Sequence, residues 1–216
     1  MLADVPPSRG GVLQPAGGTT VFMQIIQGKV RDKDLLQSQV ERWRTDVKPG
    51  AKGYLGTTSG FTPDGQYVVL VRFESEDSAR ANSDRPEQGT WWGQTAAAFD
   101  GEPTFIDCAT VDTMFGGGSN EAGFVQVMHG RAKDQEAMRT AGRSMEDELR
   151  GMRPDILGGI VGWHGDRNFV QAMYFISEDT ARKGEQEMSN DPQMDDWGQM
   201  LDGEITFLDL PEPEFD

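Results

Sequence analysis

The sequence is poor in the residue types that build most metal and nucleophile sites. Its 216 residues include one cysteine, Cys108, and two histidines, His129 and His164. A lone cysteine excludes an intrachain disulfide and a thiolate cluster, and the histidines and the cysteine show no metal-ligand spacing. Cys108 lies in an apolar run, which is typical of a small buried side chain. We therefore expect no metal site and no tightly bound cofactor.

The sequence also has few positive charges and no long apolar run. Lysine and arginine number 20 against 36 aspartates and glutamates, a formal net charge of −16. Such a surface repels nucleic acid phosphates and anionic membranes. No apolar stretch approaches the roughly 20 residues of a membrane-spanning helix, and the first residues lack the features of a signal peptide. We expect a cytoplasmic protein that binds neither nucleic acid nor membranes.

The chain contains an internal repeat with a shift of 102 positions. Phe22, Gln24, Gly28 and Asp32 match Phe124, Gln126, Gly130 and Asp134, and Ser75, Glu76 and Asp77 match Ser177, Glu178 and Asp179. A local slip then places Trp92 opposite Trp197. The ordered matches predict two copies of one unit.

The repeat divides the chain into five parts. We expect a flexible arm at 1–19, a first repeat at 20–112, a glycine-rich linker at 113–121, a second repeat at 122–210 and a C-terminal tail at 211–216. The linker is predicted from its Gly and Ser content, and the arm from its Pro and Gly content.

Each copy is predicted to have the order β-α-β-β-α-β. In the first copy we expect strands at 21–27, 54–59, 66–73 and 103–111, with helices that begin after Asp32 or Asp34, at Ser75 and at Pro86. In the second we expect strands at 123–129, 156–163, 167–175 and 204–210, and helices at 134–150, 177–188 and 192–201. This order gives an antiparallel sheet with both helices on one face, as in ferredoxin-like units. The other face is bare and apolar, so the two sheets should cover each other.

This pattern resembles the dimeric α/β-barrel superfamily, which includes antibiotic-biosynthesis-monooxygenase-like domains. The resemblance rests on the opening strands VFMQIIQG (21–28) and FVQVMHG (124–130), the junctions FESEDSARA (73–81) and FISEDTARK (175–183), and the helix starts RPEQGTWW (85–92) and DPQMDDW (191–197). Members of that superfamily usually pair two chains, so the resemblance implies an α+β protein whose two tandem units form an intrachain dimeric α/β barrel. It includes cofactor-free monooxygenases, haem-degrading enzymes and isomerases, so the fold does not give the function.

The candidate catalytic residues are His164 and His129, because histidine titrates near neutral pH. Both belong to the second copy only, where the first copy has Thr62 and Gln27. The alternative is that both are polar residues at strand ends. A histidine can also bind haem, but no histidine accompanies the asparagines and tryptophans in the helices as the haem-degrading members require.

The candidate ligand-binding residues are aromatic, amide or methionine side chains. They are Trp163, Gln24, Gln126, Trp92, Trp197 and Met173. Aromatic side chains can wall a cavity for a flat ligand or simply fill a core, and the two glutamines can orient a ligand or hydrogen-bond each other.

Two functions remain open from the sequence. The first is a small-molecule-binding protein of the monooxygenase-like type, acting as a cofactor-independent oxygenase on a substrate that forms a carbanion. The alternative is a non-catalytic structural or interaction protein in which fusion only stabilises the pseudo-dimer. A haem-binding or haem-degrading protein ranks below both. Further association of pseudo-dimers stays open.

Overall fold

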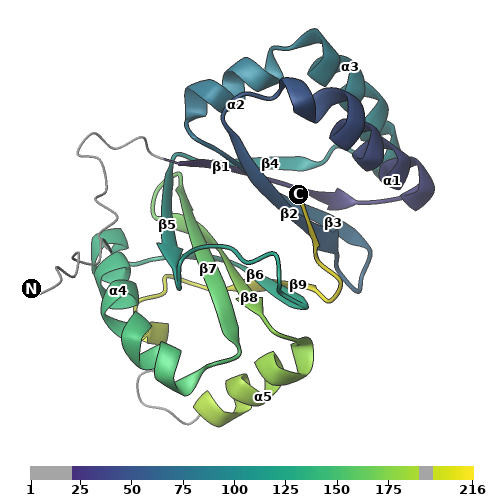
Figure 1. The fold of residues 1–216 in the computed structure, drawn as a ribbon. Coiled ribbons are helices and arrows are strands. Elements are labelled where there is room, and N and C mark those ends of the chain that lie inside the picture. The colour runs from purple at the N-terminus through teal and green to yellow at the C-terminus, as the bar shows by residue number, and fades with distance from the viewer. Residues whose placement is uncertain (1–20, 190–196) are drawn as a thin grey trace, which may run out of the picture.

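The computed structural model describes residues 21–189 and 197–216 (Figure 1). The predicted arm at 1–19 and the first half of the predicted helix at 192–201 lie outside these ranges. Within them, none of the helices is long and apolar enough to cross a membrane.

Each half folds as a sheet with helices on one face. The first half contains β1 (Phe22–Lys29), α1 (Lys33–Arg42), β2 (Tyr54–Phe61), β3 (Gln66–Phe73), α2 (Glu76–Ser83), α3 (Pro86–Thr95) and β4 (Thr104–Cys108). The second contains β5 (Thr110–Met114), β6 (Phe124–Arg131), α4 (Gln135–Met152), β7 (Ile156–His164), β8 (Asn168–Phe175), α5 (Glu178–Met188), β9 (Thr206–Leu210) and β10 (Glu214–Phe215). The α+β class and the tandem ferredoxin-like units are therefore confirmed.

The repeated sequence signals form matching helix caps. The Asp32 carboxylate accepts a hydrogen bond from the Leu35 N–H, and Asp134 does the same for Ala137. Ser75 and Ser177 cap α2 and α5 in the same way. These side chains satisfy N–H groups that the first helical turn leaves without partners.

The segment that follows each β-α-β-β-α-β unit supplies an edge strand to the sheet of the other unit. The sheet orders are β10-β2-β3-β1-β4 and β5-β7-β8-β6-β9. β5 follows β4 after one residue but pairs with β7 of the other sheet, and β10 leaves the second half to pair with β2. Each exchanged strand covers an edge that would otherwise expose unpaired N–H and C=O groups.

This exchange corrects three details of the sequence-based division. The strand expected at 103–111 is two strands in different sheets, and the tail expected at 211–216 contains β10. The linker expected at 113–121 begins inside β5, buries Phe115, and accepts a hydrogen bond at the Gly117 oxygen from the Gly159 N–H at 2.9 Å. It is therefore held against β7.

The bare faces of the sheets meet in one apolar core, as expected. Met23 and Ile25 of β1 and Val125 and Val127 of β6 are all completely buried there. The Thr58 hydroxyl of β2 also lies 2.8 Å from the Tyr174 hydroxyl of β8, so one buried hydrogen bond joins the sheets. The opposite faces carry the helices.

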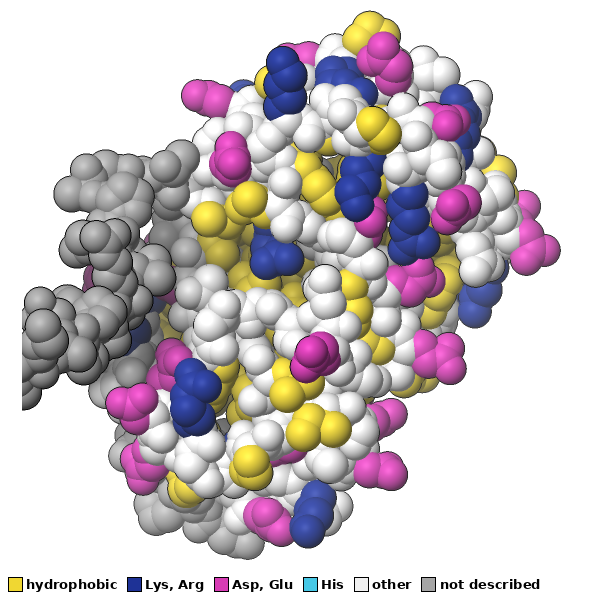
Figure 2. All heavy atoms as spheres, viewed as in Figure 1, with side chains coloured by type: hydrophobic (Ala, Val, Ile, Leu, Met, Phe, Trp, Pro, Cys, Tyr) yellow, Lys and Arg dark blue, Asp and Glu magenta, His cyan; other side chains and the backbone are white. Residues whose placement is uncertain are grey.

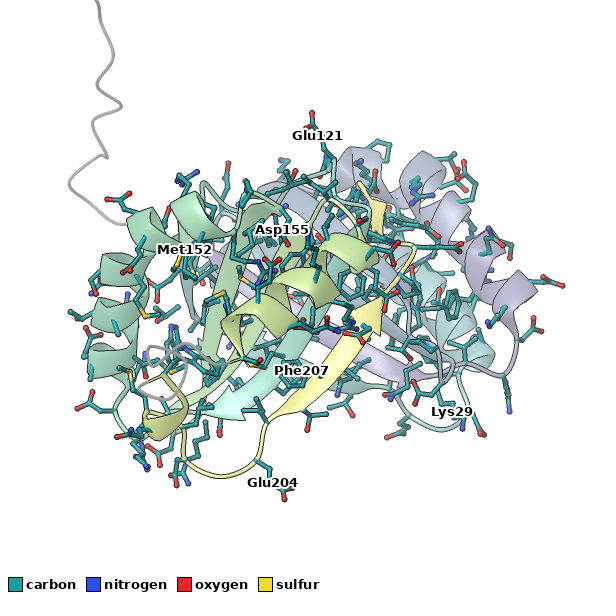
Figure 3. The ribbon with its side chains drawn as sticks, turned by 90° about the horizontal axis from the view of Figure 1, so that it is seen from below. Lys29, Glu121, Met152, Asp155, Glu204 and Phe207 are labelled. Carbon is teal, nitrogen blue, oxygen red and sulfur yellow. The ribbon has the colours of Figure 1, made fainter. Side chains whose placement is uncertain are left out.

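The outer surface is dominated by charged and polar groups. Acidic and basic side chains are spread over both halves on the face shown in Figure 2, and apolar atoms appear in the recesses between them. The largest exposed apolar groups include Phe207 on β9, the outer strand of the second sheet (Figure 3).

Candidate functional site

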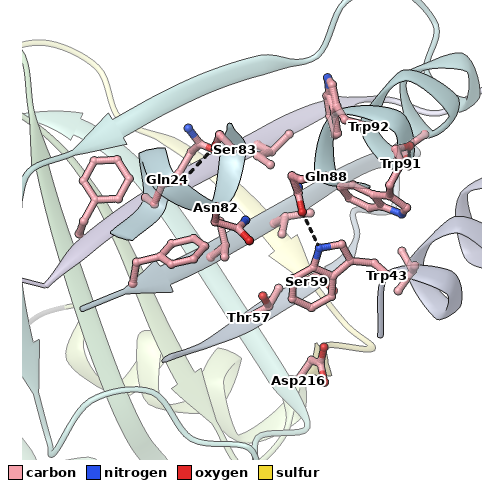
Figure 4. Close-up of a pocket in the computed structure, with 18 of the residues that line it drawn as sticks. Gln24, Trp43, Thr57, Ser59, Asn82, Ser83, Gln88, Trp91, Trp92 and Asp216 are labelled. Carbon is pink, nitrogen blue, oxygen red and sulfur yellow. Dashed lines mark hydrogen bonds between the residues drawn. The ribbon is translucent and has the colours of Figure 1, made fainter. Parts of the chain in front are cut away.

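A cavity of about 400 Å³ lies between the sheet and the helices of the first half (Figure 4). Its floor is formed by side chains of β1, β2 and β3 that point away from the other sheet, among them Ile26, Thr57 and Val69. Its walls come from α1, α2, α3 and the turn after α1. A mostly apolar concave site of this size suits a small molecule.

Three tryptophans form one wall of this cavity. The ring centroids of Trp43 and Trp91 are 6.3 Å apart, and those of Trp91 and Trp92 are 5.9 Å apart. Trp43 Nε1 donates to Gln88 Oε1 at 3.1 Å, and Trp91 Nε1 donates to the Gln39 carbonyl at 2.7 Å. With the Nε1 atoms of Trp43 and Trp91 hydrogen-bonded, these two indoles can offer apolar faces to a ligand.

The helix that carries Trp43 widens where this residue lines the cavity. Residues Trp43–Val47 form a π-helical turn, in which the Lys48 N–H donates to the Trp43 carbonyl. The turn is followed by a short 3-10 turn at Lys48–Gly50, which contains Pro49. The corresponding helix of the second half, α4, continues to Met152 without this interruption. Such π-turns are frequent at functional sites.

Several polar groups at the cavity wall are hydrogen-bonded to other side chains. Gln24 Nε2 donates to Asp107 Oδ1 at 2.7 Å, and the buried Asn82 accepts a bond from Arg85 through Oδ1 at 2.9 Å. This bond leaves the Asn82 amide nitrogen as a donor at the cavity wall. Burial raises the pKa of the Tyr67 hydroxyl, so it stays protonated.

The second half supplies part of the rim of this first-half cavity. Asp216, which follows β10, lines the cavity and forms an ion pair with Lys48. Its carbonyl accepts a bond from the Tyr54 hydroxyl at 3.1 Å, and Glu214 pairs with Arg44 at 3.1 Å. Burial raises the pKa of Tyr54 to about 12, so this hydroxyl remains a donor at neutral pH. The strand exchange therefore completes the site.

Gln24 and Trp92 are the two predicted site residues that line the cavity. The two histidines are elsewhere. His129 lies on the same face of β6 as the inward-facing Val125 and Val127, and His164 lies on the same face of β7 as Ile160, so both face the space between the sheets.

The histidines share a partly buried environment near one another. Burial lowers the pKa of both, and the charge of His164 lowers the pKa of His129 further. His129 Nε2 is buried without a hydrogen-bond partner among the described residues. Neither histidine lines the cavity, so the cavity offers carboxylates rather than an imidazole as a base.

The other predicted residues are packed or bonded in the second half. Trp163 Nε1 donates to Asp112 Oδ2 at 2.8 Å, and Trp197 packs in the same apolar cluster. Gln126 donates to Glu185 at 3.3 Å and to Asp209 at 3.2 Å, and Met173 packs against Phe124 and Phe175. The structure therefore separates these four residues from Gln24 and Trp92.

Sequence reasoning missed Trp43, Asp107 and Asp216 as cavity residues. Trp43 lies on the same helix face as Leu36 and Val40, and all three line the cavity, so helical spacing marks its face but not the presence of a cavity there. Asp107 was detectable, because Asp209 occupies the equivalent position 102 residues later and both lie on a predicted strand beside the repeated glutamine. Asp216 carried no signal because it was assigned to a tail.

The comparisons with known proteins reveal similarity of structure without close similarity of sequence. No family model matches the chain, and no curated protein matches it. A proposed monooxygenase from Fusobacterium nucleatum is similar over 91% of this chain and 94% of its own, with a TM-score of 0.70 and 9% identity. A proposed monooxygenase from Lactobacillus acidophilus has a TM-score of 0.66 and 11% identity, and covers 88% of this chain and 93% of its own.

A third similar structure is that of an anthrone oxidase-like protein. It has a TM-score of 0.62 and 11% identity, over 91% of this chain and 93% of its own. All three matches run across both halves, and their shared feature with this chain is the fold. The chain therefore has the fold of the monooxygenase-like dimeric α/β barrel, with both halves of the barrel in one polypeptide.

Proposed function

We propose that the first-half cavity binds a flat, largely apolar aromatic molecule and that the protein oxidises it with dioxygen, without a tightly bound cofactor. The observation that carries the proposal is the cavity of about 400 Å³ walled by Trp43, Trp91 and Trp92. Aromatic rings stack favourably on indole faces, which adds to the burial of apolar area.

Anthrone is the model substrate for this chemistry. Loss of a proton from its CH2 group gives a stabilised carbanion, which dioxygen can oxidise directly. The products are anthraquinone and water, so the atoms and electrons balance. The protein's part would be to hold the flat ring, exclude water and accept the proton, and the carboxylates at the cavity are the groups suited to the last task.

Haem does not fit this cavity. Neither the histidines nor Cys108 is among its lining residues, so the described part of the chain offers no imidazole or thiolate ligand to an iron held there. The remaining alternative is a protein that binds the same ligand without oxidising it.

Tryptophan fluorescence tests the binding site. Anthrone is expected to quench the emission of the wild-type protein, and Trp43→Ala is expected to weaken its affinity by about tenfold or more, because one stacking face is lost. Trp197→Phe is the matched control, since Trp197 packs in the second half, and its affinity should equal that of the wild type. If only Trp197→Phe weakens binding, the ligand occupies a different site.

Anthraquinone formation in air tests the activity. The wild type should produce it faster than buffer does, and Trp43→Ala should lower this rate in parallel with affinity. Binding without any rate enhancement would favour the non-catalytic alternative.

A further inference from the structure

Two equivalent clusters of polar residues differ between the halves. In the second half, Asp209 accepts a hydrogen bond from Gln126 and forms an ion pair with Arg182. In the first half, Asp107 accepts a bond from Gln24, but Arg80 pairs with Glu76 instead, with its Nε 3.0 Å from Glu76 Oε1. Among the described residues, the Asp107 carboxylate therefore has one hydrogen-bond donor and no ion-pair partner.

A single substitution within the repeat accounts for the difference. Glu185 of α5 binds both Arg182, at 3.1 Å, and Gln126, at 3.3 Å, and so links the arginine to the second sheet. The equivalent residue in α2 is Ser83, whose short side chain lines the cavity. Without that glutamate, no described side chain links Arg80 to Gln24, and the Asp107 carboxylate stays accessible from the cavity.

The charges around the cavity oppose an anionic ligand. The lining includes two arginines, Arg44 and Arg80, and both are engaged by carboxylates of Glu214 and Glu76. The lining also includes Asp107, which forms no ion pair with any described residue. A ligand carboxylate would meet this negative charge, and the two arginines among the described lining residues are already paired with carboxylates.

We propose that Asp107, oriented by Gln24, accepts a hydrogen bond from the ligand, so that among uncharged aromatic molecules those carrying a hydroxyl or N–H group bind most tightly. The inference rests on the proposed function of the cavity and adds its selectivity. The tryptophan wall contacts the aromatic rings, and the Asp107 carboxylate on β4 accepts the hydrogen bond from the donor group.

Three naphthalene derivatives test this selectivity at neutral pH. The affinity for naphthalene measures binding to the apolar wall alone. 2-Naphthol adds a neutral hydrogen-bond donor to the same rings, and 2-naphthoate adds a negative charge. By fluorescence titration the wild type should bind 2-naphthol about tenfold more tightly than naphthalene, because a hydrogen bond to a charged acceptor is among the stronger ones. It should bind 2-naphthoate more weakly than naphthalene.

Asp107→Asn removes the charge and keeps an oxygen that can accept the hydrogen bond from Gln24. Asp209→Asn makes the same change at the equivalent position of the second half, where Arg182 and Gln126 bind the carboxylate. The preference for 2-naphthol should disappear in Asp107→Asn and persist in Asp209→Asn, with circular dichroism confirming that both variants fold. An unchanged preference in Asp107→Asn would overturn the role of Asp107. Failure of all three compounds to bind the wild type would instead overturn the proposed function.

Discussion

Replacing Ile25 with aspartate is expected to unfold the protein at room temperature. Ile25 is completely buried between the two sheets and is surrounded by apolar side chains of both halves. A charge there has no partner, and burying an unpaired charge costs at least several kcal/mol, which is comparable with the total stability of about 5–15 kcal/mol of a small protein. Far-ultraviolet circular dichroism and urea unfolding would measure the loss.

The matched control is Ile176→Asp. Ile176 is 51% exposed at the end of the second sheet, so the same chemical change should alter the free energy of unfolding by less than about 0.5 kcal/mol. If Ile25→Asp were as stable as Ile176→Asp, the inner face of β1 would not be covered by the other half.

Replacing Gly158 with alanine is expected to disrupt the strand exchange. A Cβ atom at this position would lie 1.9 Å from the Gly117 oxygen, which already accepts the Gly159 N–H. The clashing atom belongs to the backbone, so the segment that follows β5 must move and that hydrogen bond is lost. We expect a destabilisation of about 3 kcal/mol, at the upper end of overpacking in a core.

Gly142→Ala in α4 provides the comparison. A Cβ atom there meets nothing within 4 Å, and alanine is favoured over glycine inside a helix by up to about 1 kcal/mol. Urea unfolding should show this variant to be slightly more stable than the wild type. Equal stability of Gly158→Ala and Gly142→Ala would mean that 115–118 does not pack against β7.

The fold was largely predictable because its signals are local and occur twice. Strand alternation, the caps at Asp32 and Asp134, and the matched junctions after Phe73 and Phe175 identify both units without any contact information. The meeting of the bare sheet faces follows from burial alone. The strand exchange was not predictable, because 103–111 reads as one strand and nothing local marks the residue at which the chain changes sheets.

The site was predictable only in part because it breaks the repeat. Gln24 and Trp92 repeat in the second half, so the pattern singled them out, and the structure places both at the cavity. Helical spacing groups Trp43 with Leu36 and Val40 but does not say that this face borders a cavity rather than a filled core. The lack of an ion pair at Asp107 depends on the pairing of Arg80 with Glu76. These are outcomes of packing between elements, which the sequence pattern does not contain. His129 and His164 were chosen as candidate catalytic residues partly because histidine is rare in this sequence. Rarity does not indicate which face of a strand a residue occupies.

The reactivity of Cys108 tests the central claim that the two sheets cover each other. It is the only cysteine, it is completely buried, and a Cβ atom on Gly162 of the opposite sheet would lie 2.8 Å from its sulfur. Burial raises its pKa to about 12, so the thiol is protonated and unreactive at about pH 8, where an ordinary cysteine with a pKa of about 8.5 is partly thiolate. The account predicts that a disulfide-exchange reagent labels the native protein orders of magnitude more slowly than the urea-unfolded protein. Labelling of the folded protein at the rate of the unfolded chain would show that the sheets lie apart.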